Sequence, residues 1–98
     1  MKDIETIRED LNKIKYYNSK KEWFDRVAQY VGKNDVAELF EKYNIAIRKA
    51  HPKLYEFYVS VYVLNNTHEV VAEDNDCSTT YVGKWIKNLH TYFQENLN

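Results

Sequence analysis

Glycine and proline are scarce along the chain, and this scarcity restricts the fold more than any other feature of the sequence. There are two Gly and one Pro in 98 residues. Architectures built from strands and tight turns use these residues in quantity for hairpins and bulges. Apolar residues instead recur every three or four positions, as in Ile4, Ile7, Leu11 and Ile14, which is the period of an amphipathic helix. We therefore predict an all-α fold.

The length of the chain suits a single hydrophobic core. Domains cluster near roughly 100 to 150 residues, and two independent cores in a chain this short would each be marginal. Hydrophobic residues make up 44% and charged residues 30% of the chain, which is the balance of a folded protein. We predict one compact domain of five to six helices over residues 1–98, with N-terminal helices in 1–50 and a helix-turn-helix unit in 52–98.

Start and stop signals divide the first fifty residues into three helices. The first stripe ends near the break at 16–18, and Ser19 with Glu22 has the form of a capping box that opens the next helix. Gly32 is placed to end that helix, and the capping signature repeats at 35–38. We expect the apolar residues after each start to face the core; these are Trp23, Val27, Tyr30 and Val31, then Val36, Leu39, Phe40, Tyr43, Ile47 and Ala50.

Pro52 marks the next boundary. Proline disfavours helical geometry at the residue before it, here His51, so the third helix should stop near Ala50. Proline also suits the first turn of a helix, so a fourth helix should begin at Pro52 and end at Asn65-Asn66. Its packing face is predicted to hold Tyr55, Tyr58, Val59 and Tyr62.

The last third of the chain combines a short helix, a compact turn and a long helix. The short helix runs from His68 to about Asp74, the turn covers 75–77, and Ser78 is a natural N-cap for the long helix. An apolar stripe flanked by Trp85 should anchor the long helix; it consists of Val82, Ile86, Leu89 and Phe93. The opposite face should be exposed and holds Thr79, Thr80, Gly83, Lys84 and Lys87.

Residues in this segment follow a known pattern; they are Thr67, Val71, Ala72, Cys77, Ser78 and Val82. They resemble the helix-turn-helix of sigma factor region four and of small sigma-like phage regulators of the ArpU type. In that family a small Ala lets the two helices approach, an apolar residue fills the turn, and a Val or Ile packs beneath the recognition helix. Ala72, Cys77 and Val82 match these positions. The stretch 52–64 is similar to the helix that precedes the motif in the family.

Two features depart from the family pattern. The family usually has Leu-Gly in the turn, where this chain has Asn75-Asp76. Asn and Asp are the residues other than glycine that best tolerate a left-handed backbone, so the turn can still form. The recognition helix also contains no Arg, which is the commonest side chain for reading guanine.

The resemblance implies a sequence-specific transcriptional regulator of phage or mobile-element type whose partner is double-stranded DNA. Thr79 and Thr80 would contact thymine methyl groups or phosphates, and Lys84 would reach a base or a phosphate. The candidate DNA-binding residues are Thr67, Ser78, Thr79, Thr80, Tyr81, Lys84 and Lys87. For Tyr81 a structural role is an equal alternative. A homodimer would double the contacts, and the N-terminal helices would supply its interface.

The charge balance favours an alternative function. Nucleic-acid binders are commonly basic, but this chain has a net charge of -1, and residues 67–98 hold two basic and five acidic side chains. The alternative is a protein-binding module that engages RNA polymerase or a sigma factor without binding DNA. Glu69, Glu73 and Asp74 would then contact the partner, or they form a solvated helix face. A purely structural helical bundle is a third alternative.

Catalytic, metal and cofactor chemistry have little support in the sequence. Cys77, His68 and His90 lack the paired close spacing of zinc ligands, and His51 lies far from them beside a proline. No Gly-rich oxyanion turn or phosphate loop accompanies a Cys and His pair. We expect no enzymatic activity, no cofactor and no bound metal.

The sequence also bears on the compartment. The N-terminal residues lack the apolar core of a signal peptide, and no run approaches the roughly 18 apolar residues of a membrane span. The lone Cys77 fits a reducing compartment and a small core position. We expect a cytoplasmic protein that has no membrane partner.

Overall fold

Helices make up most of the computed structural model, which describes residues 2–31 and 35–97, and these ranges contain no strand. The six α-helices and one π-helical segment, η1, are α1 (Ile4–Ser19), α2 (Lys21–Val31), α3 (Asp35–Ile47), α4 (Pro52–Tyr58), η1 (Val59–Val63), α5 (His68–Asp74) and α6 (Thr79–Asn96). The prediction of an all-α fold with five to six helices is confirmed.

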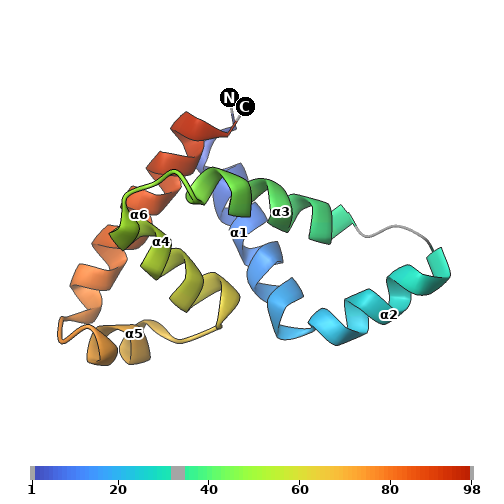
Figure 1. Cartoon of the computed structure of the whole chain (residues 1–98). Helices are drawn as coiled ribbons and strands as arrows, with labels where there is room; N and C mark the ends of the chain where they lie inside the picture. Colours follow the sequence, from blue (N-terminus) through green and yellow to red (C-terminus); the bar gives the residue numbers. More distant parts are fainter. Residues whose placement is uncertain (1, 32–34, 98) are drawn as a thin grey trace.

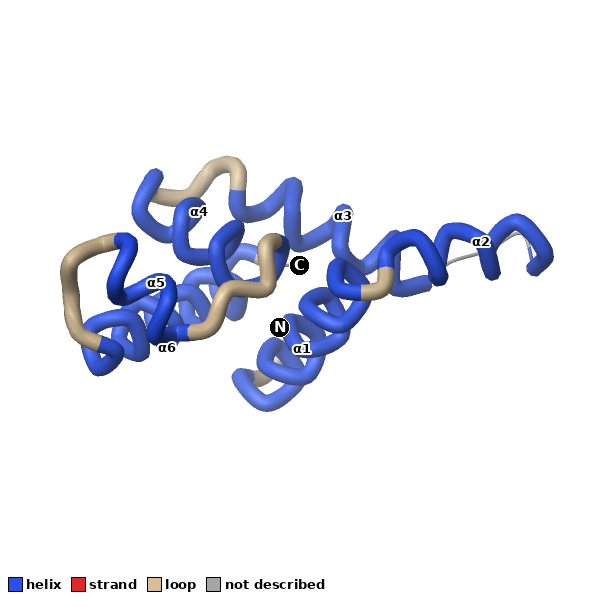
Figure 2. The backbone as a smooth tube through the Cα atoms, turned by 90° about the horizontal axis from the view of Figure 1, so that it is seen from below, coloured by secondary structure: helices blue, strands red, loops and turns tan. Residues whose placement is uncertain are grey.

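One hydrophobic cluster joins the N-terminal and C-terminal halves of the chain. Helix α1 packs against α3, η1 and α6, so that the start of α1 and the end of α6 lie side by side (Figure 1). Helix α2 packs on the end of α1 and projects away from this body (Figure 2). The fully buried side chains of the cluster are Ile7, Leu11, Ile14, Tyr43, Ile47, Phe57, Tyr58, Val61, Val71, Val82, Leu89 and Phe93.

A buried carboxylate links α1 to α3. Asp10 is 6% exposed, and its Oδ2 accepts hydrogen bonds from the hydroxyl of Tyr43 and from Nζ of Lys2, each at 2.6 Å. A buried charge is tolerated when it is paired and hydrogen-bonded in this way. Burial, together with the hydrogen bond to Asp10, raises the pKa of Tyr43 above its usual range, so the phenol remains a donor.

The π-helical segment η1 ends the fourth helix at the predicted place. The amide of Leu64 donates to the carbonyl of Val59 at 2.8 Å, which is the i to i+5 pattern of a π-helix. Asn65 then has a φ of 58°, and this left-handed residue turns the chain toward α5. Nδ2 of Asn18 in α1 donates to the carbonyl of Tyr62 at 3.0 Å and fixes η1 against α1.

The prediction of a capping box at Ser19 is wrong. Ser19 is the last residue of α1, and its hydroxyl donates to the carbonyl of Tyr16 at 2.7 Å instead of accepting from an amide of α2. Trp23 and Val27 do not face the core either, since they are 52% and 37% exposed. The reason is the projection of α2, which packs through Phe24 against aromatic rings of α1. Gly32 lies outside the described residues, as do the side chains of Tyr30 and Val31.

Two further predictions need correction around Pro52. Helix α3 ends at Ile47 and not near Ala50, because the amide of Ala50 donates back to the carbonyl of Ile47 in a tight turn. Tyr55 is 39% exposed, whereas Tyr58 and Tyr62 on the same predicted face are buried. The start of α4 at Pro52 is confirmed, and Nδ1 of His51 accepts from the amide of Lys53 at 3.1 Å as its N-cap.

Among the described residues, no helix is long and apolar enough to cross a membrane.

Candidate nucleic-acid interface

A tight turn separates α5 from α6 at the predicted position. The amide of Asp76 donates to the carbonyl of Glu73 at 3.2 Å, and the amide of Cys77 donates to the carbonyl of Ala72 at 2.9 Å. These two bonds form a Schellman motif, which satisfies the last carbonyls of a helix and requires a left-handed residue after it. Asp76 supplies that residue with a φ of 52°. The chain from 68 to 93 is therefore two helices and not one continuous rod.

Hydroxyl groups begin both helices of this unit. Oγ1 of Thr67 accepts from the amide of Val70 at 3.2 Å, and Oγ of Ser78 accepts from the amide of Tyr81 at 3.1 Å. Each hydroxyl satisfies one of the amides that the first turn of a helix leaves without an internal partner. The N-cap predicted at Ser78 is confirmed.

Small and branched apolar residues close the space between α5 and α6. Val71 is 1% exposed, Ala72 is 4% exposed, and Val82 is fully buried. Cys77 packs against the edge of the core cluster. Helix α6 buries its whole predicted stripe, which is Val82, Ile86, Leu89 and Phe93. The residues that the sequence assigns to packing in this unit therefore do pack there.

Each of the seven predicted contact residues is exposed to solvent; they are Thr67, Ser78, Thr79, Thr80, Tyr81, Lys84 and Lys87. Thr79, Thr80 and Lys84 occupy the first two turns of α6. Tyr81 is 43% exposed, and its ring meets the ring of Trp85 edge to face at 6.3 Å between centroids. Tyr81 thus has a structural contact and an exposed surface.

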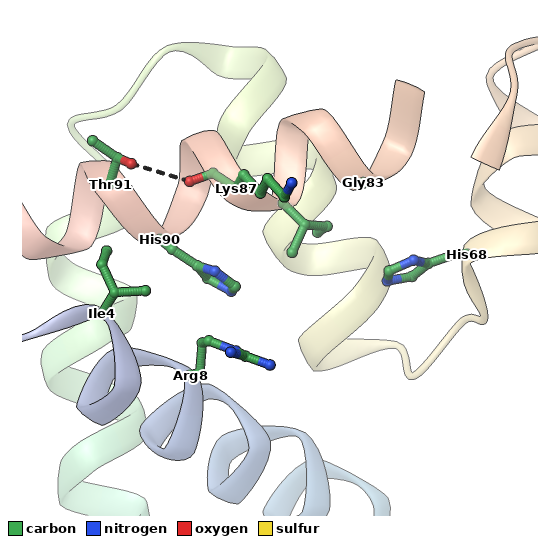
Figure 3. A pocket seen from close by; sticks show the side chains of 8 residues that line it. Ile4, Arg8, His68, Gly83, Lys87, His90 and Thr91 are labelled. Atoms are coloured by element: carbon green, nitrogen blue, oxygen red, sulfur yellow. Dashed lines mark hydrogen bonds between the residues drawn. The ribbon is translucent and has the colours of Figure 1, made fainter. Parts of the chain in front are cut away.

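The basic side chains near α6 lie on two different flanks of the helix. Lys53 places Nζ 5.7 Å from the ring centroid of Phe57, which stacks on Trp85 along one flank. Lys87 lines a cleft on the other flank together with Arg8 of α1 (Figure 3). Lysines therefore lie on both sides of α6.

Acidic side chains lie beside the turn. Glu69, Glu73 and Asp74 of α5 are exposed, and Asp76 in the turn is exposed as well. The surface of α5 next to the start of α6 is therefore acidic. A surface of this sign repels phosphate and attracts a basic protein partner.

Two histidines enter the cleft beside α6 without forming a metal site. His68 comes from α5 and His90 from α6 (Figure 3). Burial, together with the positive charge of Arg8, lowers the pKa of His90 below its ordinary value. No group of three or more His, Cys, Asp or Glu side chains suited to a metal ion occurs in the described part of the chain.

This cleft is not predictable from the sequence, because Arg8, His68 and His90 come from three separate helices. A spacing pattern within one segment gives no signal of such a site.

The sequence matches no protein-family model and no curated protein, and the fold matches no solved structure.

Proposed function

We propose that the protein is a sequence-specific DNA-binding transcriptional regulator of phage or mobile-element type, and that α6 enters the major groove. The observation that supports this proposal is the joint exposure of Thr79, Thr80 and Lys84 immediately after the sharp break between α5 and α6. A helix must project a polar end free of its own core to reach base edges in the groove.

The chemistry of these side chains suits modest sequence readout. Threonine methyl groups contact the methyl group of thymine, and threonine hydroxyls donate to phosphates or base edges. Lys84 supplies a cation for a phosphate or a guanine. The amino end of α6, an 18-residue helix, carries the positive end of the helix dipole and favours a phosphate near Ser78.

Binding to DNA is tested by selecting ligands from a random duplex library and measuring their affinity by fluorescence anisotropy at about 50 and 200 mM salt. We expect affinity to fall steeply with salt, because phosphate contacts release counterions. Lys84→Gln should weaken binding and reduce the slope of log affinity against log salt by about 1. Thr80→Val should change the selected sequence more than the salt slope, since a base contact carries sequence information.

Lys13→Gln is the matched control, because Lys13 is an exposed lysine of α1 outside the proposed interface. The control should bind the selected duplexes as the wild type does. Absence of affinity for any duplex at the lower salt concentration would contradict the proposal, and so would equal losses in Lys84→Gln and Lys13→Gln.

The proposal includes a homodimer, because one recognition helix with few base contacts gives weak specificity and two half-sites roughly double the contacts. Helix α2 is our candidate for the interface, since Trp23 and Val27 are exposed on it. Light scattering coupled to size exclusion should give twice the monomer mass, and Trp23→Ser should return the protein to a monomer. A wild-type protein that is monomeric at micromolar concentration would rule out the homodimer.

The second candidate is a module that binds RNA polymerase or a sigma factor without DNA, and the exposed acidic groups Glu69, Glu73 and Asp74 favour it. The test is a pull-down of purified RNA polymerase. This candidate is supported if the wild type and Lys84→Gln both retain the polymerase and the triple variant Glu69→Lys, Glu73→Lys, Asp74→Lys does not. Polymerase binding with no duplex affinity would favour it over the first.

A further inference from the structure

A cleft of about 540 Å³ lies where α1, α5 and α6 meet. Ile4 and Arg8 come from α1, His68 from α5, and Gly83, Lys87 and His90 from α6 (Figure 3). Sites for small organic ligands have volumes of roughly 300 to 1,000 Å³ and commonly lie between the helices of a bundle. The cleft therefore has the size and position of a small-molecule site.

Gly83 forms part of the floor of this cleft within the helix α6. A Cβ added at this position would meet no atom within 4 Å. The packing of the protein itself therefore gives no reason for a glycine, although glycine weakens a helix interior relative to alanine. The missing side chain leaves a stretch of helix backbone open to whatever enters the cleft.

The charges around the cleft are positive. Arg8 and Lys87 line it, and Lys15 lines a smaller cavity that shares Arg8, His68 and His90 with it. No Asp or Glu is among the described residues that line either cavity. Glu5 is 3.6 Å from Arg8, but both side chains are more than half exposed, and such a surface pair holds the arginine only weakly.

We propose that this cleft binds a small organic phosphate, meaning a phosphomonoester that carries an apolar or aromatic body. The phosphate oxygens would accept hydrogen bonds from the Arg8 guanidinium, the Lys87 ammonium and the His90 imidazole. The apolar body would lie against Ile4, Ile86 and the open backbone at Gly83. A dianion matches the two cations that line the cleft, and guanidinium groups bind phosphate through paired hydrogen bonds.

This inference is independent of DNA binding. Thr79, Thr80 and Lys84 do not line the cleft. Lys87 belongs to both sets of residues. The two predictions are separated by variants of Arg8 and Gly83, which leave the candidate DNA contacts unchanged, and by variants of Lys84, which leave the cleft unchanged.

Phenyl phosphate is the probe, and the readout is a titration of the 15N-labelled full chain followed by amide chemical shifts. We expect saturable binding with shifts concentrated at Arg8, Gly83, Lys87 and His90. Inorganic phosphate lacks the apolar body and benzyl alcohol lacks the charge, so each should bind at least about tenfold more weakly. The imidazole pKa of His90 should rise when phenyl phosphate is bound, because the anion stabilises the protonated ring.

Substitutions separate a built site from general attraction to a basic surface. Arg8→Gln and Lys87→Gln should each weaken phenyl phosphate binding about tenfold, which is the scale of one charged hydrogen bond. Lys49→Gln, a lysine that lines neither cavity, should bind as the wild type does. Gly83→Leu should abolish binding without lowering the melting temperature, because the new side chain enters open space in the cleft.

Three results would overturn the proposal. The first is no saturation up to about 10 mM phenyl phosphate, a concentration at which even millimolar sites fill. The others are chemical-shift changes that map to another face, and binding to Gly83→Leu as tight as to the wild type. The Gly83→Ala variant covers the case in which the larger leucine side chain prevents folding. It should fold and bind phenyl phosphate more weakly than the wild type, and unchanged affinity in this variant would count against the assignment of Gly83 to the floor.

Discussion

The two flanks of α6 contact the rest of the protein in opposite ways. On one flank the rings of Trp85 and Phe57 stack with their centroids 5.7 Å apart and an interplanar angle of 11°. On the same flank the hydroxyl of Tyr92 donates to the carbonyl of Ala46 at 2.7 Å. On the other flank, Gly83 faces open space, and a cleft lies between α1, α5 and this part of α6. The closed flank holds the helix in place, and this leaves the open flank available for contacts that do not stabilise the fold.

Removal of the largest ring on the closed flank should have the largest effect. Trp85→Ala should lower the free energy of unfolding by about 3 kcal/mol, because it deletes a ring packed against the core and leaves a cavity. Urea denaturation measures this loss. Lys87→Ala, two residues further along on the open flank, should change the stability by less than about 0.5 kcal/mol. Equal losses in the two variants would contradict the distinction between the flanks.

The hydrogen bond on the closed flank should contribute less than the ring. Tyr92→Phe keeps the aromatic packing and removes the donor to the carbonyl of Ala46, so the unfolding free energy should fall by about 1 kcal/mol. The same denaturation experiment tests it. Thr91→Val, on the neighbouring exposed position, serves as the control, since its hydroxyl bonds only a carbonyl of its own helix. A Tyr92→Phe protein as stable as the wild type would show that the bond adds nothing.

On the open flank a substitution should stabilise the protein. Gly83→Ala removes the unfavourable helix propensity of glycine and meets no neighbouring atom, so it should raise the unfolding free energy by about 0.8 kcal/mol. The midpoint of thermal unfolding should rise by about 5 °C in a domain of this size. A lower midpoint would mean that the space beside Gly83 is filled.

The smallest expected effect is electrostatic. Arg8→Gln should raise the pKa of His90, because the positive charge of Arg8 is one of two causes that hold it down; burial, the larger cause, stays in place. NMR titration of the imidazole protons measures this change. Lys13→Gln on α1 should leave the titration of His90 unaltered. If the His90 titration curve of Arg8→Gln is identical to that of the wild type, the charge of Arg8 does not influence the pKa of His90.

This depressed pKa also fixes the sign of a pH effect. Below pH 6.5, which is the ordinary pKa of histidine, the unfolded chain binds a proton on His90 that the folded chain resists. The unfolding free energy should therefore decrease as the pH falls below 6.5. The decrease should be smaller in Arg8→Gln than in the wild type. Denaturation at a series of pH values would detect the difference.

Local patterns in the sequence predict the helices best where caps and apolar spacing agree. Ser78 begins α6 and Asp74 ends α5 as predicted, because the cap hydroxyl and the left-handed turn act within a few residues of chain. At Ser19 the same kind of pattern gives a wrong result. A serine there can bond the carbonyl of its own helix as well as the next helix's amide, and only the path of α2 decides between them.

Tertiary arrangement limits what the sequence can predict about the site. The exposure of Thr79, Thr80 and Lys84 follows from the position of the apolar stripe on α6, and the sequence is sufficient for it. The cleft is different, since Arg8 lies sixty residues before His68 and comes beside it only through the packing of α1 on η1 and α6. The same holds for Trp23, whose exposure depends on the direction in which α2 leaves α1.

The winding of η1 lets the chain hold one residue more between α4 and α5 than an α-helix of the same extent would. The bond from Leu64 to Val59 spans one residue more than an α-helical bond does. Deletion of a single residue from 59–63 would let this segment rewind as an ordinary α-helix. Because a π-turn takes up about one residue more than an α-turn, the chain after the deletion would keep nearly the same direction relative to α1. The segment 59–63 is therefore a place where the chain length can change by one residue without turning α5 and α6 out of phase with the core.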